Sequence, residues 1–289
     1  MPLLDADALA ERAYAKVNLA LHVRERRTDG YHELESLFVF ARDGDLLTGE
    51  ATEDGSISLM LDGPFADALE AGEGNLVMKA ARLMQERLGE KRGAAIRLTK
   101  TLPVASGIGG GSADAAAALR LLNRLWGAQL PSAELERIGL LLGSDVPACI
   151  SSVTQMVRGR GEVLEQREVH GLTGMPMLLV NPGVALSTAQ VFKGWDQQDR
   201  GPLDVGTLED VIVRGRNDLG PPAIQVAPII AEVLAQLHGQ AGVQLTRMSG
   251  SGATCFALFD QSESRSAAAK ALVAQRPGWW IMETEIGGA

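Results

Sequence analysis

The chain has few cysteines, fewer basic than acidic residues and no long apolar run. Its two cysteines, Cys149 and Cys255, lie in apolar surroundings without metal-ligand spacing, which predicts buried thiols in a reducing compartment. Lysine and arginine number 27 against 36 acidic residues, which argues against broad binding of nucleic acids or anionic membranes. No apolar run reaches membrane-spanning length, and residues 1–12 lack the apolar segment of a secretory signal. We therefore expect a cytoplasmic protein.

Two common phosphate-binding patterns are also missing. No Gly-Lys-Ser or Gly-Lys-Thr occurs, and the dinucleotide pattern G-x-G-x-x-G fails at Ser112. Residues 103–116 nevertheless contain four glycines, Gly107 and Gly109 to Gly111, between a strand-like run and a helical one. Glycine permits a positive φ and close approach of a ligand, and a helix N-terminus favours an anion. This segment predicts a phosphate-binding loop; the alternative is a plain glycine hinge with Ser112 as a helix cap.

An early hairpin carries a second group of polar residues. Residues 12–24 and 31–40 alternate as strands, and Asp29-Gly30 between them is a strong turn signal. Lys16 and Asn18 fall on one strand face, and Tyr31 and His32 follow the turn on the same predicted sheet. A solvated face is the simpler interpretation of the lysine.

The remaining pattern mixes helices and strands. Residues 75–88 predict a helix capped by Asn75, and residues 131–142 a helix that ends at Gly143. Asp145 then lies in a tight apolar turn before Pro147, where it is either a partnered functional carboxylate or a turn or capping residue. Short strands are expected within 45–61 and at 94–100, 155–165, 177–180, 244–249, 254–259 and 279–284. Helices are expected at 113–126, 209–213, 222–238 with a possible break at Pro228, and from Ser262. Hairpins beside helices indicate an α+β protein.

In this order the motifs resemble the GHMP kinase family, which has a central loop like Pro103–Ala113 and a second glycine loop like Met248–Ala253. The resemblance implies a two-domain α+β fold. Its N-terminal ATP-binding domain, residues 1–153, would be ribosomal-protein-S5-domain-2-like. Its C-terminal domain, residues 154–289, would be ferredoxin-like, with the active site in the cleft between the two.

Five further segments resemble one branch of the family, whose acceptor is a cytidine-diphosphate-linked methylerythritol in isoprenoid precursor synthesis. Four of them are Ala15–Leu19, Asp29–Leu34, Gly143–Pro147 and Asn181–Val184, and the fifth, Arg247–Ala253, extends the second glycine loop by one residue; the triple glycine Gly109–Gly111 is also typical of this branch. Ala105-Ser106 stands where glycines are more usual, and Ala113 replaces a second serine. The alternatives are another GHMP kinase of mevalonate or homoserine type and a catalytically silent sugar-phosphate-binding protein. The resemblance implies a small-molecule substrate, ATP and Mg²⁺, and a monomer or weak homodimer.

The resemblance also implies roles for individual residues. Asp145 would be the general base, and Lys16 would be its electrostatic partner. The nucleotide-binding residues would be Pro103, Ser106, Gly107, Gly109, Gly110, Gly111 and Ser112, with Asn75 and Lys100 nearer the base. The acceptor-binding residues would be Asn18, Tyr31, His32, Thr188 and Phe192. Ser112 would be the nearest protein ligand of Mg²⁺. A helix cap is the alternative for Asn75, and a solvated lysine for Lys100.

Overall fold

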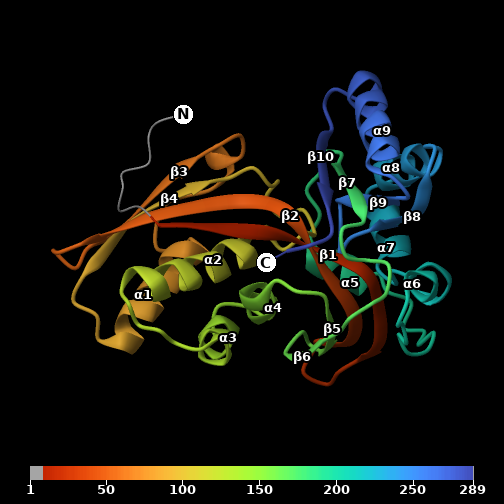
Figure 1. Ribbon diagram of the computed structural model, residues 1–289. Coiled ribbons are helices and arrows are strands. Elements are labelled where there is room, and N and C mark those ends of the chain that lie inside the picture. The colour runs from red at the N-terminus through yellow and green to blue at the C-terminus, as the bar shows by residue number, and fades with distance from the viewer. Residues whose placement is uncertain (1–8, 289) are drawn as a thin grey trace. The chain divides into compact units, whose positions relative to one another are not determined.

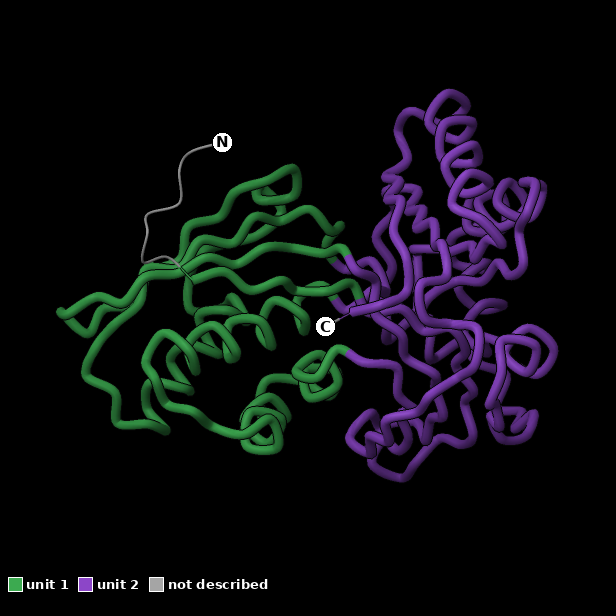
Figure 2. Tube along the Cα trace, viewed as in Figure 1, with its two compact units in different colours: residues 1–15, 43–104, 110–152 green, residues 16–42, 105–109, 153–289 purple. Residues whose placement is uncertain are grey.

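The computed structural model describes residues 9–288, so most of the segment considered for a targeting signal lies outside the described residues. The chain forms two compact units, coloured green and purple in Figure 2. Unit 1 comprises residues 1–15, 43–104 and 110–152, and unit 2 comprises residues 16–42, 105–109 and 153–289. The long strands β1 (Leu9–Arg26) and β2 (His32–Thr52) each contribute residues to both units. The division into domains 1–153 and 154–289 stays a prediction.

Unit 1 is a sheet with helices along one face (Figure 1). In this sheet the strand β4 (Gly93–Thr99) pairs antiparallel with the second half of β2 and parallel with β3 (Ile57–Asp62). Its other elements are β3 (Ile57–Asp62), η1 (Ala66–Ala68), α1 (Leu76–Leu88), β4 (Gly93–Thr99), α2 (Gly110–Leu125), α3 (Ser132–Leu140) and α4 (Val146–Ser151). The alanines of α2, residues 115–118, are fully buried. Their small side chains let this helix pack closely on its neighbours.

Unit 2 contains a four-stranded antiparallel sheet in the order β10-β7-β9-β8. This is the strand order of a ferredoxin-like fold, and α8 and α9 pack on the sheet (Figure 1). The hairpin β5–β6 pairs with the first half of β2. The elements are β5 (Gln155–Gly159), β6 (Val163–Gln166), β7 (Pro176–Asn181), α5 (Thr188–Lys193), α6 (Leu208–Arg214), α7 (Gly220–Val226), α8 (Ile229–His238), β8 (Val243–Met248), β9 (Cys255–Phe259), α9 (Ser262–Gln275) and β10 (Trp280–Glu285).

The α+β class is confirmed, and so are the local helix signals. Asn75 caps α1 through its side chain, and Gly89 ends that helix in the left-handed conformation. The predicted break at Pro228 separates α7 from α8. Both cysteines are buried free thiols. Within residues 9–288 no helix is both long and apolar enough to cross a membrane.

Several element boundaries were predicted wrongly. Residues 45–52 continue β2 through Gly44, where a Cβ would lie 1.9 Å from the carbonyl oxygen of Ala13, so the glycine permits close packing rather than ending a strand. The predicted strand 155–165 is the β5–β6 hairpin, and α5 was not predicted. The turn before Pro147 opens into the short helix α4, because proline is tolerated in a first helical turn.

Two serines do not cap the helices assigned to them. Helix α2 begins at Gly110, so Ser112 is already a helical residue. Likewise Ser262 is the first residue of α9, and the N-cap position belongs to Gln261. The strand and helix periods therefore found most of the elements, while the ends of several, such as α2 and α9, were misplaced by one to three residues.

Candidate active site

The two glycine loops meet backbone to backbone in unit 2. Gly107 has a φ of +80°, and a Cβ there would lie 2.6 Å from the Ser249 carbonyl oxygen and 2.7 Å from that of Gly252. The Ser249 hydroxyl donates to the Gly107 carbonyl at 2.9 Å, and the Thr254 amide donates to the Ser106 carbonyl at 3.1 Å. The structure therefore brings together the first half of the predicted nucleotide loop and the second glycine loop.

Lys16 and Asn18 support the same loop from β1. The Lys16 ammonium donates to the Asn18 Oδ1 at 2.8 Å and lies 4.4 Å from the centroid of the Phe38 ring. The Lys16 amide donates to the Ile108 carbonyl at 3.0 Å, and the Asn18 amide donates to the Ser249 hydroxyl at 3.0 Å. Only 4% of Lys16 is exposed, so the solvated-face interpretation is wrong.

The second half of the loop is the beginning of α2 in unit 1. Gly110, Gly111 and Ser112 form its first turn, and Pro103 is buried ahead of it. The first four amides of a helix have no partner within the helix, and the helix dipole is positive at that end. A sixteen-residue helix beginning on two glycines therefore presents backbone donors where a phosphate would be stabilised.

A buried ion cluster lies beneath this helix start, and the sequence did not predict it. The Lys100 ammonium is 2.5 Å from the Asp45 Oδ2 and 2.6 Å from the Asp114 Oδ2, and only 2% of Lys100 is exposed. The second oxygen of Asp45 accepts from the amides of Thr101 and Leu102 at 2.6 and 2.8 Å. The cluster thus ties the residues entering the glycine loop to the helix leaving it. The solvated-lysine interpretation is wrong, while a nucleotide contact by Lys100 stays a prediction.

This cluster contains two carboxyl groups, Asp45 and Asp114, but only one ammonium group, that of Lys100. The pKa of Asp114 is raised from its usual 3.8 to about 7, because burial and the charge of Asp45 raise it by more than the charge of Lys100 lowers it. Burial opposes the Lys100 charge, but the two carboxylates together raise the pKa of the ammonium. The Oδ1 of Asp114 is buried without a hydrogen-bond partner within residues 9–288. One ammonium therefore pairs with two carboxylates, and the pKa of Asp114 is raised.

We expect Asp114→Asn to become more stable relative to the parent protein as pH rises. The pKa of Asp114 in the folded parent lies above that in the unfolded chain, so protonation of Asp114 stabilises the folded parent fully below about pH 4. This stabilisation is lost as pH rises through about 7, whereas asparagine does not titrate. Urea unfolding of both proteins at about pH 5 and about pH 8 measures the difference. Asp67→Asn, at an exposed site, is the control. A difference in unfolding free energy equal at both pH values would contradict this account.

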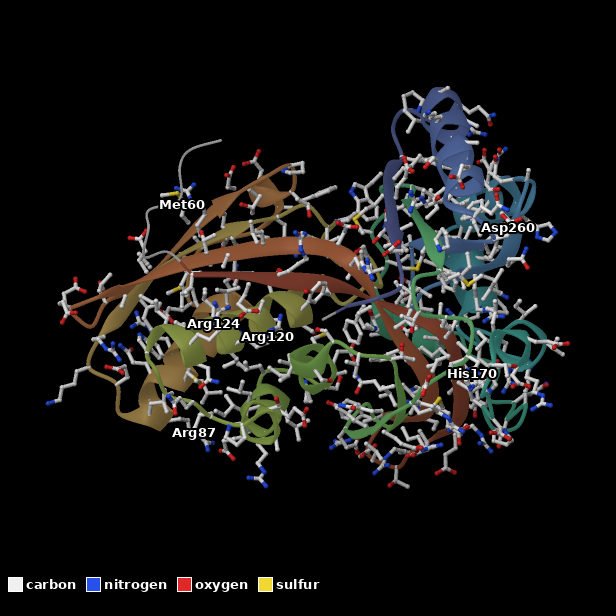
Figure 3. All side chains as sticks on the ribbon, in the orientation of Figure 1. Met60, Arg87, Arg120, Arg124, His170 and Asp260 are labelled. Atoms are coloured by element: carbon white, nitrogen blue, oxygen red, sulfur yellow. The ribbon has the colours of Figure 1, made fainter. Side chains whose placement is uncertain are left out.

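Asp145 occupies the N-cap position of α4, but its side chain makes no capping hydrogen bond to that helix. The structure therefore gives no support to a capping role. The other end of α4 is held by Arg120 of α2, labelled in Figure 3, which donates to the carbonyls of Cys149 at 2.7 Å and Ile150 at 3.2 Å. Glu11 fixes this guanidinium at 3.1 Å. The placement of Asp145 thus follows from the anchoring of α4 on α2.

His32 belongs to an aromatic cluster in unit 2. Its ring centroid lies 4.9 Å from that of Phe192 with a 33° tilt, and 5.7 Å from that of Trp195 in an edge-to-face arrangement. Burial, followed by the charge of Arg26, lowers the pKa of His32 and favours the neutral ring. Phe192 therefore lies beside His32, and acceptor binding by the two rings stays a prediction. Trp195 was not predicted because residues 195–206 carry no regular pattern.

Two other predicted acceptor residues lie on exposed parts of unit 2. Tyr31 is 59% exposed, with the Arg160 guanidinium 5.3 Å from its ring centroid. Thr188 begins α5, the helix that also carries Phe192, and its hydroxyl is 3.0 Å from that of Ser251 in the second glycine loop. Helix α5 thus links the aromatic cluster to this loop.

Asn75 has a structural role of its own. Its side chain accepts from the Val77 amide at 2.9 Å and donates to the Glu70 carbonyl at 3.0 Å. The helix-cap alternative is therefore confirmed, and a nucleotide contact stays a prediction. Across residues 9–288 no three or more His, Cys, Asp or Glu side chains cluster as a metal site.

Comparison with known proteins identifies the family. A family model described as the N-terminal domain of GHMP kinases matches residues 75–152, and one described as the GHMP kinase C-terminal region matches residues 206–277. The chain belongs to the GHMP kinase family. The resemblance carried by the two glycine loops is thereby confirmed, and GHMP kinases use ATP as the phosphoryl donor.

Individual relatives of this GHMP kinase carry a more specific name. The 4-diphosphocytidyl-2-C-methyl-D-erythritol kinases of Rhizorhabdus wittichii and Sphingopyxis alaskensis are 52% and 47% identical to it. The alignments cover 96% and 95% of this chain, and 94% and 97% of the relatives. A crystal structure of 4-(cytidine 5′-diphospho)-2C-methyl-D-erythritol kinase matches with a TM-score of 0.81 and 32% identity, over 97% of this chain and 100% of that one. Homoserine kinase from Cytophaga hutchinsonii, at 19% identity and a TM-score of 0.75, shares the fold over 99% and 97% of the two chains.

Proposed function

We propose that this GHMP kinase transfers the γ-phosphoryl group of ATP to the 2-hydroxyl of 4-diphosphocytidyl-2-C-methyl-D-erythritol. The products would be the 2-phosphate and ADP, in the non-mevalonate synthesis of isoprenoid precursors. The observation that carries the proposal is near-full-length similarity to relatives of that name at 52% and 47% identity. The packing of His32 against Phe192 supports it, because a flat ring pair suits a nucleobase handle on the acceptor.

The nucleotide would bind along the glycine loop. Backbone donors between Ser106 and Ser112 would hold the phosphates at the N-terminus of α2, and the base would lie toward Asn75 and Lys100. Bound Mg²⁺ would neutralise phosphate charge, held mainly by phosphate oxygens and water with Ser112 as its protein ligand. The half-buried position of Ser112 in the first turn of α2 fits that role.

Asp145 would accept the proton of the attacking hydroxyl. As the acceptor 2-oxygen bonds to the γ-phosphorus, the bond from that phosphorus to the β,γ-bridging oxygen breaks and ADP leaves. Lys16 would hold the Asp145 carboxylate ionised and offset charge on the transferred group. Lys16 belongs to unit 2 and Asp145 to unit 1.

The cytidine end of the acceptor would be bound by Tyr31, His32 and Phe192, with Asn18 and Thr188 contacting its polar part. A neutral His32 can donate from one ring nitrogen and accept at the other, which suits the edge of a cytosine. We also expect the enzyme to be cytoplasmic and a monomer or weak homodimer.

Removing the His32 ring should weaken acceptor binding selectively. Stacking contributes about 1–3 kcal/mol per base, so His32→Ala should raise the KM for the acceptor about 5- to 150-fold. The KM for ATP should stay within about twofold, because His32 lies with Phe192 rather than with the glycine loops. His170→Ala, at the exposed histidine labelled in Figure 3, is the matched control. An unchanged acceptor KM would argue against this site.

An ADP-release assay with ATP, Mg²⁺ and a panel of acceptors tests the function. We expect turnover with 4-diphosphocytidyl-methylerythritol and little with mevalonate or homoserine. Faster turnover of either control would assign another GHMP kinase activity. ATP binding without turnover of any acceptor would indicate a catalytically silent protein.

A further inference from the structure

Asn217 lies between α6 and α7 in unit 2, and its side-chain amide is fully used by backbone partners. Its Nδ2 donates to the carbonyls of Met248 at 2.7 Å and Gly250 at 2.8 Å. Its Oδ1 accepts from the amide of Leu219 at 2.9 Å. Only 9% of Asn217 is exposed, so water cannot readily replace these bonds. The Asn217 side chain is therefore hydrogen-bonded to the second glycine loop on both sides of Ser249.

Ser249 connects the second glycine loop to the predicted nucleotide loop. Its hydroxyl accepts from the Asn18 amide at 3.0 Å and donates to the Gly107 carbonyl at 2.9 Å. Gly250 has a φ of +55°, and a Cβ there would stand 3.0 Å from the Gly107 carbonyl oxygen, so the two loops are in close contact. Asn217 thus holds the two residues that flank Ser249, and the Ser249 hydroxyl in turn holds the Gly107 carbonyl.

We propose that Asn217 is a positioning residue that sets the distance between the two glycine loops and thereby the affinity for the nucleotide phosphates. Without its two donors, the carbonyls of Met248 and Gly250 would lack these partners, and the turn that carries Ser249 would relax toward other donors. Gly107 would then lose the contact that fixes its carbonyl. This inference rests on the proposed nucleotide role of residues 106–112.

The neighbours of Asn217 hold different parts of unit 2. Asp218 accepts from the Val23 amide at 2.9 Å and pairs with the Arg216 guanidinium at 2.8 Å. Arg216 also donates to the Gly201 carbonyl at 2.9 Å. The hydrogen bonds of Asp218 and Arg216 reach β1 and the segment after α5, whereas those of Asn217 reach the second glycine loop. Substitution of Asn217 alone therefore tests the loop.

Asn217→Asp is the most informative variant, because it keeps the oxygen that accepts from Leu219 and replaces the two-proton donor by an acceptor. We expect the Kd for ADP, measured by calorimetry, and the KM for ATP to rise at least about tenfold, with the acceptor KM within about twofold. Asn123→Asp in unit 1 is the matched control. Its amide likewise donates to and accepts from one backbone residue, Leu130, at 3.0 and 2.9 Å.

A folded Asn217→Asp protein that binds ADP within about twofold of the parent would overturn the proposal. If that variant does not fold, Ser249→Ala removes the next link, and an unchanged ADP Kd there would overturn it equally. ADP binding needs no acceptor, so it measures the role of Asn217 even if the proposed acceptor is not turned over. If the parent protein itself did not bind ADP, the proposed nucleotide site would be wrong, whatever the role of Asn217.

Discussion

Replacing Asp145 with asparagine is expected to lower kcat by about a thousandfold or more while ADP still binds. Asparagine has the shape of aspartate but cannot accept the hydroxyl proton, so the lost stabilisation of the transition state should be about 4 kcal/mol. Helix α4 should keep its place, because Arg120 holds the carbonyls of Cys149 and Ile150 and Asp145 makes no capping bond. Steady-state kinetics give kcat, and calorimetry gives the Kd for ADP.

The exposed Asp67 provides the matched control for this substitution in the same unit. Asp67→Asn should leave both kcat and the Kd for ADP unchanged. If Asp145→Asn turned over within about tenfold of the parent, a difference of only about 1.4 kcal/mol, the general-base assignment would be wrong.

Gly107→Ala should reduce ADP affinity about a hundredfold or more. The φ of +80° disfavours alanine, and its Cβ would lie 2.6 Å from the Ser249 carbonyl oxygen and 2.7 Å from that of Gly252. Both obstacles are backbone atoms, so relief requires the two glycine loops to separate. The measurement is ADP binding by calorimetry, with thermal unfolding to establish that the variant is folded.

Gly278→Ala is the control for that variant, because a Cβ at Gly278 meets nothing within 4 Å and the residue has no positive φ. It should bind ADP like the parent. A folded Gly107→Ala protein with ADP affinity within about threefold of the parent would show that close contact of the two loops is not needed for nucleotide binding.

Local signals in the sequence were enough to find much of the fold. Asn75 and Gly89 mark the ends of α1 because a cap and a left-handed glycine are determined within one turn of helix. The two-residue period placed Lys16 and Asn18 on one strand face, and the structure joins them by a 2.8 Å hydrogen bond. The glycine pattern likewise located Gly107, where a φ of +80° and nearby backbone atoms leave no room for a side chain.

The missed features of the candidate site depend mainly on residues brought together from distant parts of the chain. Asp45 lies in β2, Lys100 directly follows β4 and Asp114 lies in α2, and no local pattern indicates that one ammonium pairs with both carboxylates. Helix α2 begins at Gly110 although glycine has a low helix propensity, and a Cβ there would lie only 3.1 Å from the Lys100 ammonium. Asn217 is more than thirty positions from the carbonyls it holds, so its importance appears only in the fold.

The central claim is phosphoryl transfer from ATP to the 2-hydroxyl of 4-diphosphocytidyl-methylerythritol, and the most direct measurement is analysis of the product. After incubation with ATP and Mg²⁺, phosphorus NMR and mass spectrometry should show one new phosphomonoester on carbon 2, formed in equal amount to ADP. ADP formed without any phosphorylated acceptor, or phosphate attached at another hydroxyl, would contradict the account.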